Sequence, residues 1–134
     1  MEIVSALKHL LPQLTKNFKS FHLNELKEIV ESDSTRLFIA VDRSSGDEIV
    51  GTYTFVMFRI PTGKILRIED VIVDERRRGK GIGKLMMNHA IILAKNEGSI
   101  KIELTSHPSR VEANKLYKSL DFTKIDTNVY RLKI

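Results

Sequence analysis

The chain has no cysteine, only three prolines and no long run of apolar residues among its 134 residues. Without cysteine, a disulfide framework, a thiolate metal site and an acyl-cysteine intermediate are all excluded. The apolar stretch near the N-terminus, Leu7 to Leu14, is short and interrupted by polar residues, so we expect neither a signal peptide nor a membrane span. The sequence therefore predicts a cytoplasmic protein in which no cysteine side chain takes part in structure or catalysis.

Basic residues outnumber acidic ones, 22 to 17, which gives a formal net charge of +5. Such a balance permits a nucleic-acid partner but does not require one. The densest basic cluster, residues 76–84, has no aromatic residue between its arginines, although such residues are common on nucleic-acid-binding surfaces. We therefore expect no nucleic-acid partner and keep a basic nucleic-acid-binding domain only as an alternative.

Turn residues and hydrophobic periodicity divide the chain into helices and strands without a linker or an internal repeat. The predicted elements are a helix ending near residue 15, a helix over 23–30, strands over 37–41, 49–60 and 65–73, a helix over 82–96, a strand over 100–104, a helix over 110–120, and a closing hairpin of 122–124 and 129–132. This order predicts one α/β domain over residues 1–134, with an antiparallel meander followed by βα crossovers in a mixed sheet.

A glycine-rich turn joins the strand that ends at Val73 to the helix over 82–96. The stretch from Val71 reads V-I-V-D-E-R-R-R-G-K-G-I-G, and its three glycines allow successive backbone N–H groups to point at one oxyanion at a helix N-terminus. The countercharge would come from Arg76, Arg77, Arg78, Lys80 and Lys84. The spacing fits neither a Walker A loop nor a dinucleotide fingerprint, and the structural alternative is a solvated charge run.

Two ordered motifs give this turn a more specific meaning. The pattern Arg78-x-x-Gly81-x-Gly83 after a hydrophobic strand resembles the acetyl-CoA pyrophosphate loop of the GNAT family of N-acetyltransferases. The stretch from Leu104 to Phe122 resembles that family's next strand, helix and closing aromatic residue. Its matching positions are Arg110, Ala113, Asn114, Leu116, Tyr117 and Phe122. The resemblance covers residues 37–134 well and the first 36 loosely, and it implies a GNAT-like acyl-CoA acyltransferase fold.

The resemblance implies that acetyl-CoA is the cosubstrate and that two central strands, 65–73 and 100–105, splay apart to seat its pantetheine arm. In the family, the first of these strands pairs with pantetheine through its backbone, and the loop holds the pyrophosphate. The implied cofactor-binding residues are Val71, Ile72, Val73, Arg78, Gly79, Lys80, Gly81, Ile82, Gly83, Lys84 and Asn114. The N–H of Val71 would also donate to the oxygen of the reacting carbonyl.

The resemblance implies two catalytic side chains. Glu69 matches a family glutamate that takes a proton from the acceptor amine; the alternative is a solvated residue or an ion-pair partner of Arg67. We expect the next residue, Asp70, to point to the opposite face of the strand. Tyr117 shares a helix face with Asn114 and matches the tyrosine that protonates the departing thiolate; the alternative is a core tyrosine.

The chain departs from the family pattern at two places. Asp121 stands where a glycine usually precedes the closing aromatic residue, so we expect a left-handed backbone there. Residues 1–4 leave almost no room for the family's first strand before helical periodicity begins, so we expect that strand to be either absent or contributed in a different way. An unpaired sheet edge at the N-terminus or in the last hairpin leaves a homodimer open.

The sequence thus predicts an acetyl-CoA-dependent N-acetyltransferase that transfers the acetyl group directly to a primary amine. We expect a small-molecule acceptor first and a protein amine second; family selectivity resides in the first helices, their connecting loop and the strand after Gly51, where this chain has Phe18 and Tyr53. A sensor that binds acetyl-CoA without turnover is the alternative. His89 is expected in the core and His107 in a helix-cap loop, and because no metal-ligand spacing occurs we predict no metal.

Overall fold

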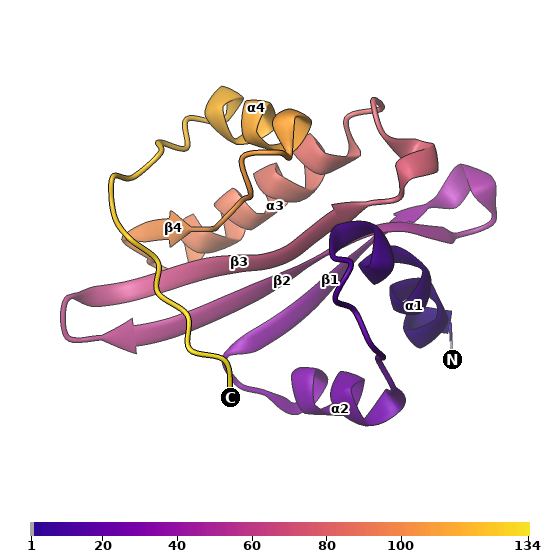
Figure 1. Ribbon diagram of the computed structural model, residues 1–134, viewed down its shortest axis with the longest axis horizontal. Helices are drawn as coiled ribbons and strands as arrows, with labels where there is room; N and C mark the ends of the chain where they lie inside the picture. Colours follow the sequence, from indigo (N-terminus) through magenta and orange to yellow (C-terminus); the bar gives the residue numbers. More distant parts are fainter. Residues whose placement is uncertain (1) are drawn as a thin grey trace.

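Four helices and one four-stranded sheet form the fold of residues 2–134, which are the residues that the computed structural model describes (Figure 1). The helices are α1 (Glu2–Leu14), α2 (Leu23–Glu31), α3 (Ile82–Asn96) and α4 (Val111–Ser119). The strands are β1 (Thr35–Asp42), β2 (Glu48–Ile60), β3 (Gly63–Val73) and β4 (Lys101–Glu103), and two 3-10 turns are η1 (Arg43–Ser45) and η2 (Glu75–Arg77). The predicted order and type of every element as far as α4 are confirmed.

The sheet is mixed, with the strand order β1-β2-β3-β4. The first three strands form an antiparallel meander, and β4 joins the edge of β3 in parallel after the chain has crossed over through α3. This confirms the predicted mixed α/β class. Of the two predicted crossovers only the one through α3 is complete, because α4 leads to no further strand within residues 2–134.

Each face of the sheet is covered by two helices, α3 and α4 on one side and α1 and α2 on the other (Figure 1). The α3 side holds the larger core, because β2 and β3 direct large apolar side chains at one stripe of α3. Its buried members are Tyr53, Phe55, Leu66, Ile68, Met86, Met87, Ala90, Ala94 and Tyr117. A smaller cluster of Leu10, Ile49 and Ile72 seats α1 on the other face.

Helix α1 takes the place at the start of the chain where the family usually has a strand. Its apolar residues recur every three positions, and Val4, Leu7 and Leu10 are buried against the sheet. No strand precedes β1 in the part of the chain that the structure describes, so β1 forms an edge of the sheet. No helix within residues 2–134 combines the length and the apolar character that crossing a bilayer requires.

The predicted closing hairpin of 122–124 and 129–132 is wrong. Residues 120–134 contain no strand, and Val129, Tyr130 and Leu132 are all more than 70% exposed. A hairpin gains stability only when it packs against a sheet or a helix, and β4 offers an edge of just three residues. The tail therefore runs from α4 past the sheet without joining it (Figure 1). The expected left-handed backbone at Asp121 is confirmed, with φ of 67°.

Candidate active site

Strand β3 contains a bulge in its C-terminal half. The register with β2 changes from Thr54 opposite Glu69 to Thr52 opposite Ile72, so β3 holds one extra residue there. Asp70 lies in this step with φ of 50°, a left-handed conformation that is uncommon for a residue other than glycine. A bulge bends its strand and re-aims the neighbouring side chains, which is a frequent arrangement beside active sites.

The strands β3 and β4 stop pairing just before this bulge. Their parallel ladder covers three residue pairs, the last being Arg67 opposite Glu103. Beyond Arg67, the edge of β3 that faces β4 has no partner strand within residues 2–134, so backbone N–H and C=O groups there remain open to a ligand. The predicted splay of the two central strands is confirmed. One side chain crosses it, because the Arg110 guanidinium donates a long hydrogen bond of 3.5 Å to the Val71 carbonyl.

The loop between β3 and α3 has the conformation that an anion-binding turn needs. Gly79 and Gly81 have φ of 78° and 80°, and a Cβ at either would meet no atom within 4 Å, so backbone conformation and not crowding favours glycine here. Gly81 is also the N-cap of α3 and supplies no side-chain acceptor to the first turn of the helix. The free N–H groups of that turn and the helix dipole therefore present a positive end to an incoming anion.

Gly83 is needed for a different reason. It has helical backbone geometry, and a Cβ on it would lie 3.2 Å from Leu116 Cδ2 and 3.8 Å from Val73 Cγ2. The missing side chain lets the start of α3 approach α4 and the end of β3. Gly83 therefore serves packing as well as the openness of the loop.

Two of the five cations predicted to serve an anion are used within the fold. Arg76 pairs with Asp74 at 2.9 Å and with Glu48 at 3.0 Å, and Arg77 pairs with Asp42 at 2.6 Å and with Glu48. These carboxylates compensate both guanidinium groups. The prediction that Arg76 and Arg77 supply countercharge to a ligand is therefore wrong.

The other three cations of the loop keep their charge available. Within residues 2–134, Arg78, Lys80 and Lys84 form no ion pair, and Arg78 makes one hydrogen bond, from Nε to the Val73 carbonyl at 3.2 Å. All three belong to the loop or to the first turn of α3. The positive charge left for an anion is thus concentrated at the N-terminus of α3.

Asp74 is the anchor of this loop. Its carboxylate is completely buried and accepts hydrogen bonds from the Arg76 side chain at 2.9 Å, the Arg76 N–H at 3.1 Å and His9 Nε2 on α1 at 3.0 Å. Hydrogen bonds from the Arg76 side chain, and with smaller effect from the Arg76 N–H and His9, hold the pKa of Asp74 well below its usual range. Gln13 adds a bond of 2.9 Å to the Glu75 N–H, so α1 and the loop are joined at two points.

The Tyr117 side chain lies in the larger core, on the α4 side of the splay. It is 7% exposed and packs against Phe122 with ring centroids 5.8 Å apart. Its hydroxyl has no hydrogen-bond partner within residues 2–134. Because the only buried side-chain atoms without a partner in that range are the hydroxyls of Ser99 and Ser106, the Tyr117 hydroxyl must reach solvent. Burial raises the pKa of Tyr117, which keeps the phenol protonated and able to donate.

Asn114 fixes the loop that leads into α4. Its Nδ2 donates to the His107 carbonyl at 2.9 Å and to the Arg110 carbonyl at 2.8 Å. The side-chain amide nitrogen is therefore occupied, and a cofactor contact of Asn114 stays a prediction. His107 Nδ1 accepts from the Ser109 N–H at 3.1 Å, as expected for helix-cap chemistry.

Glu69 forms an ion pair on the face of the sheet that α1 and α2 cover, opposite to α3 and α4. Arg67 donates to its Oε1 from Nε at 3.1 Å and from Nη2 at 3.0 Å, and Arg67 also approaches Glu103 at 3.8 Å. Because Ile68 points into the α3 core, the alternation along β3 directs Arg67 and Glu69 to the α1 face. The ion-pair interpretation of Glu69 is thus realised, and about two-fifths of its side chain still reaches solvent.

Asp70 is a candidate that the sequence analysis missed. Desolvation raises the pKa of its carboxyl, and the neighbouring Glu69 carboxylate raises it further, while the side chain stays accessible at the surface. The predicted orientation opposite to Glu69 assumed regular alternation, which the bulge interrupts. A bulge at an acidic residue cannot be read from the pattern I-E-D-V-I-V, so no sequence signal pointed to Asp70.

The expected core position of His89 is wrong, because His89 is exposed, and the expected acceptor contact of Tyr53 is wrong, because Tyr53 is buried. His89 Nδ1 lies 2.6 Å from the Tyr53 hydroxyl; the Tyr53 ring stacks on Phe38, and the His89 ring meets Phe38 edge-on. Tyr53 is 1% exposed, so it is a core residue and not a contact for the acceptor. Both residues line a hollow beside α3 that also includes Lys80 and Ile82.

The open edge of β3 thus leads to a cationic helix N-terminus, and Glu69 lies on the same strand as that edge. A sequence model of the Acetyltransferase (GNAT) family matches residues 3–122. The chain belongs to this family. It is an acetyltransferase by family, and the match includes residues 3–36, which the sequence resemblance covered only loosely.

Solved structures agree with the family assignment. Glucosamine-6-phosphate N-acetyltransferase from Arabidopsis thaliana is 25% identical with a TM-score of 0.79, over 96% of this chain and 92% of that one. An acetyltransferase of Trypanosoma brucei is 22% identical with a TM-score of 0.80, over 98% and 92%. A protein described as a transcriptional regulator from Bacillus halodurans C-125 is 29% identical with a TM-score of 0.75, over 84% and 74%. The GNAT fold of this chain is thereby established.

Replacing Asp74 with alanine should destabilise the protein by about 3 kcal/mol, because removal of this buried carboxylate would leave its hydrogen-bond donors without an acceptor. Urea unfolding at pH 7 measures this, with exposed Asp33→Ala as the control. The folded pKa of Asp74 is lowered, so its contribution is present above the unfolded value of about 4 and is lost as the pH falls further. A gap between wild type and Asp74→Ala that did not shrink between pH 5 and pH 2 would contradict this assignment.

Proposed function

We propose that this acetyltransferase uses acetyl-CoA and transfers the acetyl group directly to the nitrogen of a primary amine. The observation that carries the proposal is the unpaired cationic N-terminus of α3, which lies at the end of the unpaired edge of β3. A pyrophosphate and a 3′-phosphate need such a cationic rim, and a pantetheine arm with two amides suits a strand edge with free N–H and C=O groups.

The residues of the loop fit the cofactor's anionic end. Arg78, Lys80 and Lys84 are not neutralised by carboxylates of residues 2–134, and the backbone around Gly79 and Gly81 leaves open space above it. The Val71 carbonyl, which the pantetheine would pair with, accepts a long bond of 3.5 Å from Arg110. A contact at the limit of hydrogen bonding is easily exchanged for a better one.

The reaction needs one bond made, one bond broken and two proton movements. The nitrogen lone pair of the neutral amine forms the C–N bond to the acetyl carbon, and the C–S bond breaks to release the coenzyme A thiolate. A carboxylate at the β3 bulge, Glu69 or Asp70, takes the amine proton directly or through water, and Tyr117 gives its proton to the thiolate. The phenol regains a proton from solvent through its opening to the surface.

A small amine is the first choice of acceptor, and a protein amine is the second. The support for the first is the relative from Arabidopsis thaliana, whose name specifies an amino-sugar phosphate. The carboxylates Glu69 and Glu103, which both lie beside Arg67, would attract a protonated amine before it loses its proton.

A second candidate function is a regulatory module that binds acetyl-CoA without turnover. The 29% identity to a chain described as a transcriptional regulator favours it. The two functions differ in thiol release, because only an enzyme liberates free coenzyme A when an amine is added.

Gly81→Glu should weaken acetyl-CoA binding at least 100-fold, because a carboxylate at the helix N-terminus would repel the pyrophosphate. Calorimetric titration measures the affinity. Gly98→Glu is the matched control, since Gly98 also has a positive φ, of 72°, an empty space around its Cβ and a position at the opposite end of α3. Equal losses in both variants would mean that backbone strain, and not the phosphate site, explains the effect.

Tyr117→Phe should lower kcat by about 100-fold and change acetyl-CoA affinity little, because it removes a proton donor without altering the packing against Phe122. Thiol release with an amine acceptor gives kcat, and calorimetry gives the affinity. The exposed Tyr130→Phe serves as the control. If Tyr117→Phe kept full turnover, the phenol would be only a core residue.

The base can be assigned by comparing Asp70→Asn with Glu69→Gln. If Asp70 is the base, Asp70→Asn should lower kcat/KM about 100-fold and remove an acidic limb from the pH profile that lies above the usual range for aspartate. Glu69→Gln should then change kcat/KM by less than tenfold, since its main partner is Arg67. The reverse order of effects would assign the role to Glu69.

A further inference from the structure

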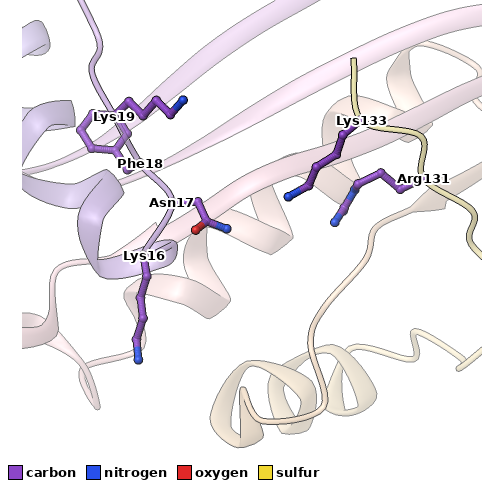
Figure 2. A pocket seen from close by; sticks show the side chains of 6 residues that line it. All are labelled: Lys16, Asn17, Phe18, Lys19, Arg131 and Lys133. Atoms are coloured by element: carbon purple, nitrogen blue, oxygen red, sulfur yellow. The ribbon is translucent and has the colours of Figure 1, made fainter.

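Four cations from two distant parts of the chain line one open cavity. Lys16 and Lys19 lie in the loop between α1 and α2, and Arg131 and Lys133 lie in the C-terminal tail (Figure 2). The cavity has a volume of about 560 Å³, and Asn17 and Phe18 complete its lining. No carboxylate contributes to it, so the lining is entirely cationic apart from one amide and one aromatic ring.

These charges are not compensated within the fold. Within residues 2–134, none of the four cations forms an ion pair, whereas Arg76, Arg77 and Arg67 are all held by carboxylates. Like charges gathered around one space repel one another, and an anion between them would relieve that repulsion. The fold thus places positive charge around a space that a small anion could fill.

The cavity lies on the same face of the sheet as Glu69. Residues 16–19 connect the two helices that cover this face, and the alternation along β3 directs Glu69 to it. The loop that carries Arg78 and Lys80 instead lies at the N-terminus of α3, whose body covers the other face (Figure 1). The cationic cavity is therefore separate from the site proposed for the cofactor's phosphates.

We propose that this cavity binds the phosphate group of the amine acceptor, so that the acceptor is a small phosphorylated amine. This inference rests on the proposed function, because it assigns the second substrate of the same reaction. The amine would be drawn to the carboxylates at the β3 bulge while the phosphate is held between the α1–α2 loop and the tail.

A phosphate monoester fits the cavity better than a singly charged group. It carries close to two negative charges at neutral pH and presents three acceptor oxygens. The Arg131 guanidinium can bind two of them in a bidentate manner, and lysine ammonium groups serve phosphate as point charges. The Asn17 amide can supply a further neutral donor.

The test uses glucosamine and glucosamine-6-phosphate, two amines that differ by one phosphate monoester. Steady-state thiol release with saturating acetyl-CoA should give a kcat/KM at least tenfold higher for the phosphorylated amine, mainly through a lower KM. In the double variant Lys19→Gln/Arg131→Gln this ratio should fall close to one. The control Lys27→Gln/Lys95→Gln removes the same charge from exposed, unpaired positions and should keep the ratio.

Equal kcat/KM for the two amines, or a ratio that persists in Lys19→Gln/Arg131→Gln, would overturn the inference. So would an equal loss of acetyl-CoA affinity in that variant, because the cavity would then serve the cofactor. If neither amine is turned over, the proposed acetyl transfer to amino sugars is wrong. Calorimetric titration of glucosamine-6-phosphate then still tests whether the cavity binds a phosphorylated amine. Binding that the double variant loses supports the cavity; no binding, or equal binding of inorganic phosphate or a DNA oligomer, contradicts it.

Discussion

The early end of the ladder between β3 and β4 is the constraint on which the rest of the site depends. A continuous sheet satisfies its backbone groups internally and has no room for a ligand between its strands. Here the pairing ends at Arg67 and Glu103, and the bulge at Asp70 follows within a few residues. The open edge that results leaves backbone N–H and C=O groups of β3 available to a ligand.

Asp74 connects that opening to the rest of the molecule. A buried carboxylate is costly unless every lone pair has a donor, and here the donors come from the loop and from α1. The position of α1 on one face of the sheet and the shape of the loop at the start of α3 therefore cannot vary independently. Arg76 and Arg77 belong to this framework, which explains why only part of the basic cluster at residues 76–84 is free to bind an anion.

The order and type of the elements could be predicted from the sequence because hydrophobic periodicity and turn residues mark them strongly. The closing hairpin could not, since the alternation in residues 129–134 says nothing about whether a partner edge exists. In the site, the loop glycines and Tyr117 followed from ordered motifs. Asp70, the pairing of Arg76 and Arg77, and the cationic cavity depend on contacts between residues far apart in the chain, which no local pattern encodes.

The three loop glycines show that one motif can combine two kinds of requirement. Gly79 and Gly81 are needed because their backbone has a positive φ, whereas Gly83 is needed because α3 and α4 approach each other closely there. A side chain at Gly83 would push Leu116 away, and Leu116 precedes Tyr117 on the same helix. The position of Tyr117 thus depends on the absence of a methyl group on another helix, and a larger residue at Gly83 would move α4 relative to the start of α3.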